Sequence, residues 1–226
     1  MGYSLDVSNK GISSLEGFQH FKNAGINSLY AQNNRLTQLQ ELSDGLQTLW
    51  VQKNILVNLP ALPSNLQYLK CEENFLNVFE GDLKTVLESL IANTKTYEPQ
   101  YRYIYTGQPV VLYTGQTAAL TAEQVELQQS GRTESGEIIW ETVDTANLED
   151  FIFSSSDTSV AAVDSTGKIT AAGSGSCTIY ADYLGLESAF TRISVSVIVN
   201  EPPLAPPPVL VGAETNIDGT IITLAF

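Results

Sequence analysis

The chain has 226 residues and a formal net charge of −14, with 43% hydrophobic residues and a mean hydropathy of −0.01. These values allow one large or two ordinary domains with buried cores, and a pI near 4.3 argues against charge-driven binding to nucleic acid or anionic membranes. One histidine excludes metal sites built from several histidines. The apolar runs are too short to cross a membrane, and residues 1–10 lack the features of a signal peptide. We therefore expect either a cytosolic protein or a piece of a longer precursor.

Charge and composition divide the chain into two parts. The first 95 residues carry seven Lys or Arg and nine Asp or Glu, and they are rich in leucine. The remaining residues carry four and sixteen, and Ser, Thr, Val, Ala and Gly replace leucine. This shift predicts two structural regimes. After them, the proline-rich stretch 201–208 predicts a stiff extended linker.

The leucine-rich part repeats every 20 residues. From the anchors Leu29, Leu49 and Leu69, apolar residues recur three positions before and two, seven and ten positions after, and asparagine recurs five positions after. A looser copy begins near Leu5. The apolar positions at the anchor and two beyond it predict the inward face of a short strand. The recurring asparagine suits a tight turn whose unpaired backbone groups its amide can satisfy. No single unit can bury its apolar face alone, so the units are expected to stack.

The segments INSLYAQNNRLTQL, LQTLWVQKNILVNL and LQYLKCEENFLNVF resemble the leucine-rich repeat family, in its short bacterial type. The resemblance implies a solenoid over residues 1–95, with parallel strands joined by loop or helical returns. The repeats end at EGDLKTVLESLIANT, whose apolar spacing is helical. We interpret this segment as a helix that caps the last repeat, with a linker helix as the alternative.

Residues 101–200 form short alternating runs separated by Gly, Ser and Asp, which predicts an all-β sandwich. Asp164–Gly167 predicts a hairpin turn. The run FSSSDTSVAAVDSTGKITAAGSGSCTIYA resembles the group 2 bacterial immunoglobulin-like domain, which implies the same sandwich. Residues 128–150 are longer and more acidic than the matching spacer of that family. Residues 209–226 predict a strand, an Asp-Gly turn and a strand, as in the truncated start of a further β-module.

The chain carries few residues suited to catalysis or metal binding. His20 lies between repeats, and no G-x-S-x-G context is near it. Cys71 and Cys177 occupy strand core positions in different parts of the chain, which argues against a disulfide between them. The carboxylates form no calcium-binding loop, and no glycine-rich phosphate loop is present. We therefore predict a protein that is not an enzyme and has no cofactor or metal.

The outward side chains of the predicted solenoid strands form a candidate binding face. Stacking places Tyr30, Trp50 and Lys70 in one ladder, with Thr48 and Tyr68 in the next. Exposed Trp and Tyr side chains on an open sheet resemble interface anchors. The alternative is that Trp50 packs against a neighbouring module or the Lys70 stem. The predicted binding residues are Tyr30, Gln32, Trp50, Gln52, Tyr68, Lys70 and Glu72.

Together the two resemblances are similar to the internalin-type layout of bacterial surface adhesins. That layout implies an extracellular or cell-surface protein whose solenoid binds a protein or glycan and whose immunoglobulin-like module acts as a spacer. From the low pI and the short apolar runs we expect no nucleic acid partner and no membrane insertion in this segment. Because fold does not fix function, two alternatives stay open: a structural component of a phage virion or appendage, and an accessory binding region of a larger surface enzyme.

Overall fold

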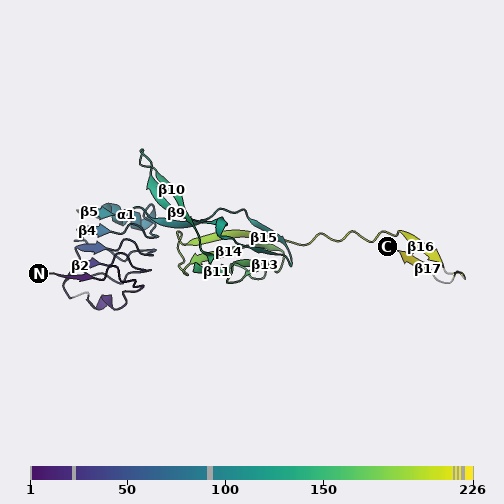
Figure 1. Ribbon diagram of the computed structural model, residues 1–226, viewed down its shortest axis with the longest axis horizontal. Helices are drawn as coiled ribbons and strands as arrows, with labels where there is room; N and C mark the ends of the chain where they lie inside the picture. Colours follow the sequence, from purple (N-terminus) through teal and green to yellow (C-terminus); the bar gives the residue numbers. More distant parts are fainter. Residues whose placement is uncertain are drawn as a thin grey trace.

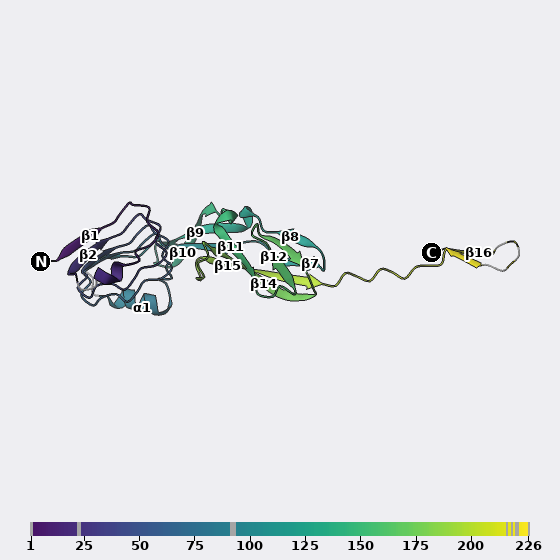
Figure 2. The same cartoon turned by 90° about the horizontal axis from the view of Figure 1, so that it is seen from below.

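The computed structural model describes residues 2–21, 24–90, 94–215, 217, 219 and 222–225. The chain is elongated (Figures 1 and 2). A parallel-sheet unit, residues 3–96, stands at the N-terminal end, and an antiparallel unit, residues 101–200, follows it. An extended stretch then leads to a small hairpin at the C-terminal end.

In the parallel-sheet unit, five described strands lie side by side in chain order, and all of them pair in parallel. They are β1 (Tyr3–Asp6), β2 (Ile26–Tyr30), β3 (Thr48–Trp50), β4 (Tyr68–Lys70) and β5 (Thr94–Thr96). A short 3-10 helix, η1 (Phe18–Phe21), lies in the first return. The predicted inward positions are buried, as in the anchors Leu29, Leu49 and Leu69, each 0% exposed. The repeating apolar columns therefore fill one continuous core.

The recurring asparagines join each turn to the previous one. Asn54 accepts a hydrogen bond from the backbone N–H of Leu36 at 3.0 Å, and its amide nitrogen donates to the carbonyls of Ala31 and Val51. Asn74 repeats this pattern one strand further on. The residue before each asparagine has a positive φ, and those residues are Asn33, Lys53 and Glu73. Side-chain amides thus satisfy the buried backbone groups of these left-handed turns, as predicted.

The sheet continues past the helix that was expected to cap it. The helix, α1 (Gly81–Ser89), forms the return between β4 and β5, and β5 adds a further parallel strand beside β4. Lys95 stands opposite Leu69, at the position where the other strands place an apolar anchor. Its Nζ donates to the carbonyls of Leu87 and Leu90 near the end of α1, at 2.6 and 3.2 Å, which suits a cation near a helix C-terminus. The sequence conceals this fifth strand because Lys95 replaces the apolar anchor.

Gln100 takes the place of the asparagine in this last turn. It stands five residues after Lys95 and is 0% exposed. Its Oε1 accepts from the N–H of Leu76 at 3.1 Å, and its Nε2 donates to the carbonyl of Cys71 at 3.0 Å. The backbone N–H of Gln100 donates to the hydroxyl of Ser130, in the antiparallel unit. Gln100 therefore continues the series of buried side-chain amides, which we call the ladder, and connects the last turn to the antiparallel unit.

The antiparallel unit contains three sheets, with strand orders β10-β9-β6, β11-β14-β15-β7 and β12-β13-β8. All of the pairings are antiparallel except β15 with β7. The short helices η2 (Ala122–Gln124) and η3 (Leu148–Asp150) lie between strands. The strands are β6 (Tyr101–Tyr105), β7 (Val110–Tyr113), β8 (Thr117–Ala119), β9 (Val125–Arg132), β10 (Ile138–Thr145), β11 (Phe151–Ser155), β12 (Ala161–Val163), β13 (Lys168–Ala171), β14 (Gly175–Tyr183) and β15 (Arg192–Asn200).

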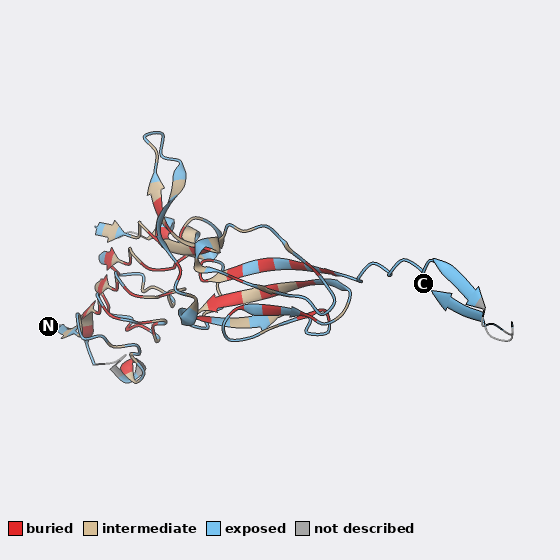
Figure 3. Cartoon of the chain, turned by 45° about the vertical axis from the view of Figure 1, so that its right-hand side comes forward, coloured by how far each residue is buried: buried red, intermediate tan, exposed pale blue. Residues whose placement is uncertain are grey.

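The long acidic spacer of the sequence is a β-hairpin. Strands β9 and β10 pair over most of their length, and the hairpin projects from the body of the unit (Figure 3). The predicted turn at Asp164–Gly167 joins β12 to β13. Inward residues of the sheets β12-β13-β8 and β11-β14-β15-β7, such as Ile169, Ile179 and Val195, are fully buried in one core. The predicted all-β architecture of this region is therefore present.

The C-terminal segment also has the two predicted strands, β16 (Gly212–Thr215) and β17 (Ile222–Ala225), paired antiparallel. Their described side chains are exposed (Figure 3). The predicted Asp-Gly turn lies partly outside the described residues, since Asp218 is not among them. A two-stranded hairpin of this size is marginally stable by itself.

Candidate binding face

Strand pairing brings the predicted binding residues of the sheet together on one face. Tyr30 lies opposite Trp50, and Trp50 lies opposite Lys70. Thr48 lies opposite Tyr68 in the neighbouring row. We call this surface the outer face, and it comprises the predicted residues Tyr30, Gln32, Trp50, Gln52, Tyr68, Lys70 and Glu72 together with Ser28, Thr48 and Thr96.

The side chains of Tyr30, Trp50 and Lys70, which we call the central row, pack against one another. The rings of Tyr30 and Trp50 are 5.0 Å apart and meet edge to face at 81°. The Nζ of Lys70 lies 4.4 Å from the centre of the Trp50 ring. Both contacts are favourable for a partly exposed indole. The alternative in which Trp50 packs against the Lys70 stem is thus partly met, while Tyr68 next to this row remains 42% exposed.

Three polar atoms at the centre of the outer face are buried without a hydrogen-bond partner among the described residues. They are the side-chain oxygens of Gln32 and Gln52 and the indole nitrogen of Trp50. Buried polar groups normally find a partner, and each exception invites an explanation. These three atoms belong to side chains of the outer face rather than to the apolar core.

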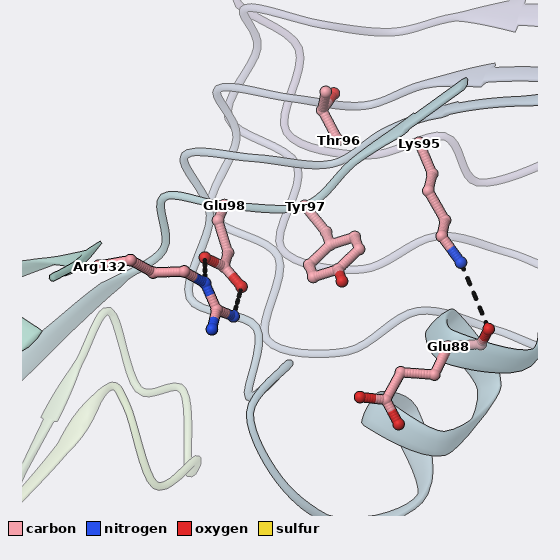
Figure 4. Close-up of a pocket in the computed structure, with 6 residues that line it drawn as sticks. All are labelled: Glu88, Lys95, Thr96, Tyr97, Glu98 and Arg132. Atoms are coloured by element: carbon pink, nitrogen blue, oxygen red, sulfur yellow. Dashed lines mark hydrogen bonds and ion pairs between the residues drawn. The ribbon is translucent and has the colours of Figure 1, made fainter. Parts of the chain in front are cut away.

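Two polar contacts lie on or just after β5, at the edge of the sheet. Glu72 accepts a hydrogen bond from the hydroxyl of Thr96 at 2.7 Å. Glu98 forms an ion pair with Arg132 on β9, which ties the projecting hairpin to the end of the sheet. An open hollow of about 560 Å³ lies beside this pair (Figure 4). Its lining residues are Glu88, Lys95, Thr96, Tyr97, Glu98 and Arg132. Its charged groups are already engaged, because Arg132 pairs with Glu98, Lys95 donates to the end of α1 and Glu88 pairs with Lys84, so the hollow is a structural junction.

The antiparallel unit contacts the parallel-sheet unit on the turn side, away from the outer face. Phe75 lies at the centre of this junction, 5.8 Å from the ring of Tyr103 and 5.6 Å from that of Tyr183. Phe79 contacts Trp140 on the hairpin at 5.4 Å. None of Tyr30, Trp50 or Lys70 belongs to this cluster within the described residues. The antiparallel unit therefore does not pack on the outer face, which differs from the alternative in which Trp50 packs against a neighbouring module.

The junction was missed by the sequence analysis, although a signal was available. Positions six after each anchor hold Arg35, Ile55 and Phe75, so an exposed column becomes apolar in the repeats that contact the second unit. Trp140 stands in the acidic spacer and also lies under the guanidinium of Arg102, whose central carbon is 4.1 Å from the ring centre. Apolar residues at positions expected to be exposed, such as Ile55 and Phe75, are the sequence feature that indicates this contact.

The remaining candidates for chemistry take structural positions. Cys71 and Cys177 are free and buried, and burial raises the pKa of the Cys71 thiol. His20 is exposed on η1. Across the described ranges, no group of three or more His, Cys, Asp or Glu side chains is arranged to hold a metal ion. The helices in that part of the chain include none long and apolar enough to cross a bilayer.

Comparison with known proteins gives one family match. A family model described as "Intimin, immunoglobulin-like domain" matches residues 150–182, which extend from the end of η3 into β14. No curated protein matches the chain. Among solved structures, the chain is similar to Listeria monocytogenes InlP, with 13% identity and a TM-score of 0.24, over 77% of this chain and 53% of that one. The chain thus spans about half the length of that protein.

Proposed function

We propose that this chain is a non-catalytic binding protein of a bacterial surface, placed outside the cell. In this proposal residues 1–95 are a leucine-rich-repeat solenoid, residues 101–200 an immunoglobulin-like spacer, residues 201–208 a linker and residues 209–226 the start of a further β-module. The solenoid binds a protein or glycan through the outer face. The similarity of residues 150–182 to an intimin immunoglobulin-like domain supports a surface and adhesion role.

The observation that carries the proposal is the aromatic row that the second unit leaves open. The antiparallel unit packs on the turns at Phe75 and Phe79, and Trp50 is not among the described residues of that junction. Aromatic side chains at the centre of a surface are the usual anchors of interfaces. Short parallel strands stacked in register offer such anchors on a stiff support, as repeat proteins do with their sheet surfaces.

The proposal is tested by screening the chain against an array of oligosaccharides and a panel of purified extracellular proteins. Truncation of Trp50 to alanine should weaken the binding that this screen finds by about 2 kcal/mol or more. Circular dichroism should show an unchanged fold, because Trp50 lies on the sheet surface outside the core. Unaltered affinity of the Trp50→Ala variant, or a screen without any ligand, would refute a binding role for the outer face.

A further inference from the structure

Lys70, at the centre of the outer face, is a cation for which the described residues provide no carboxylate partner. Its contact in that part of the chain is the ring of Trp50, at 4.4 Å, and it takes part in no ion pair there. Glu72 stands two residues further along on the same face. The hydroxyl of Thr96 donates to Glu72 at 2.7 Å and holds it at the edge of the sheet. Lys70 therefore presents a cation without a direct ion pair among the described residues, although the chain as a whole has a net charge of −14.

The groups around Lys70 are suited to a polar chain laid across the strands. Within the described residues, the buried indole nitrogen of Trp50 lacks an acceptor, and the buried side-chain oxygens of Gln32 and Gln52 lack donors, so a bound chain reaches them when these side chains turn outward. A peptide offers both kinds of group at short intervals. Hydrogen bonds that involve an ionised group are the stronger kind, so a carboxylate at Lys70 would give the main polar contact.

We propose that the outer face recognises an acidic protein segment, whose Asp or Glu carboxylate pairs with Lys70 while neighbouring side chains pack on Tyr68 and Tyr30. This inference rests on the proposed function and names the partner chemistry of the same face. A protein segment fits better than a sugar, because Lys70 covers one side of the Trp50 ring and the Tyr30 ring packs against it, with the two ring centres 5.0 Å apart. A pyranose ring would need an open aromatic face to stack on, whereas enriched aromatic residues among polar groups are typical of protein interfaces.

The test begins with a phage-displayed library of random dodecapeptides selected on the whole chain. Each enriched peptide is then synthesised in two forms. The acidic form keeps its Asp or Glu residues, and the amide form has Asn or Gln in their place. The affinities of both forms are measured by calorimetry. We expect the acidic forms to bind at least about tenfold more tightly, which corresponds to about 1.4 kcal/mol. Binding of the acidic forms should also weaken as the salt concentration rises.

Variants of Lys70 separate charge from packing. Lys70→Met keeps an apolar stem over Trp50 and removes the charge, so it should lose about tenfold in affinity, whereas Lys70→Arg should retain binding. Lys10→Met is the matched control, because it changes the net charge equally at an exposed turn off the outer face. It should leave the affinity unchanged, and circular dichroism should confirm that each variant is folded.

Each other outcome overturns the inference in a recognisable way. If Lys70→Met binds like the parent chain while Trp50→Ala does not, the carboxylate pairing is wrong and the proposed function stands. The assignment of the partner as a protein segment is wrong if no peptide is enriched but sialylated or uronic-acid oligosaccharides bind in a manner that depends on Trp50. If the selected peptides bind Trp50→Ala as well as the parent chain, the inference and the proposed function both fail.

Discussion

The ladder of buried amides makes a quantitative prediction about the stability of the parallel-sheet unit. Replacing Asn54 by alanine leaves the buried N–H of Leu36 without an acceptor. The three carbonyls that Asn54 serves each keep another donor, since Ala31 is also bound by Asn34, Val51 by Asn74 and Gln52 by the backbone N–H of Asn33. One orphaned donor is worth about 1–3 kcal/mol. We therefore expect Asn54→Ala to lower the free energy of unfolding by about 2 kcal/mol, and Asn74→Ala by a similar amount through Leu56.

The double variant distinguishes a shared ladder from independent side chains. With both amides removed, the carbonyl of Val51 loses its two donors, at 2.9 and 3.1 Å. The combined loss should therefore exceed the sum of the single losses by about 1 kcal/mol, a coupling of the size seen between residues of one hydrogen-bond network. Equilibrium urea unfolding, followed by tryptophan fluorescence, measures all three variants. Asn58→Ala, at an exposed position, is the control and should change stability by less than about 0.5 kcal/mol. Additive losses, or single losses as small as the control, would refute the ladder.

Three further predictions concern the turns, the junction and the thiols. Lys53 has a φ of 58°, so Lys53→Asn, which copies Asn33 of the previous repeat, should raise the free energy of unfolding by up to about 1 kcal/mol; an unchanged or lower melting temperature would contradict this. Phe75→Ala should cost about 3–5 kcal/mol and should split thermal unfolding into two calorimetric transitions, because Phe75 fills the junction between the units; a single transition at the parent temperature would count against a coupled junction. Cys71 and Cys177 should resist a disulfide reagent in the folded chain and react in denaturant, since both thiols are buried and a raised pKa reduces the Cys71 thiolate further; rapid labelling of the native chain would contradict this.

The sequence was informative where structure depends on short, repeated spacing. Leu49, Val51 and Asn54 recur with the same offsets in neighbouring repeats, so their burial in one core and one turn followed directly from the pattern. The outer row followed too, because side chains alternate along a strand. The pairing of Tyr30, Trp50 and Lys70 is as predicted, although their role in binding stays a prediction.

The sequence was less informative where contacts join distant segments or a repeat loses its signature. β5 was missed because Lys95 replaces an apolar anchor and because α1 lengthens the return before it. The junction was missed because the partners of Phe75, such as Tyr103 and Tyr183, lie on strands of the second unit, and no local spacing links them. The self-packing of Trp50 under Lys70 depends on side-chain conformation, which periodicity does not specify.

The most direct test of a binding role for the outer face compares two tyrosines of equal exposure. Tyr68 on the outer face and Tyr113 on the antiparallel unit are both 42% exposed, so their replacement by alanine removes similar surface area from each unit. With the ligand found in the array and panel screen, titration calorimetry should show Tyr68→Ala binding at least about tenfold more weakly than Tyr113→Ala, which should match the parent chain. Equal affinities for the two variants would contradict a binding role for this face.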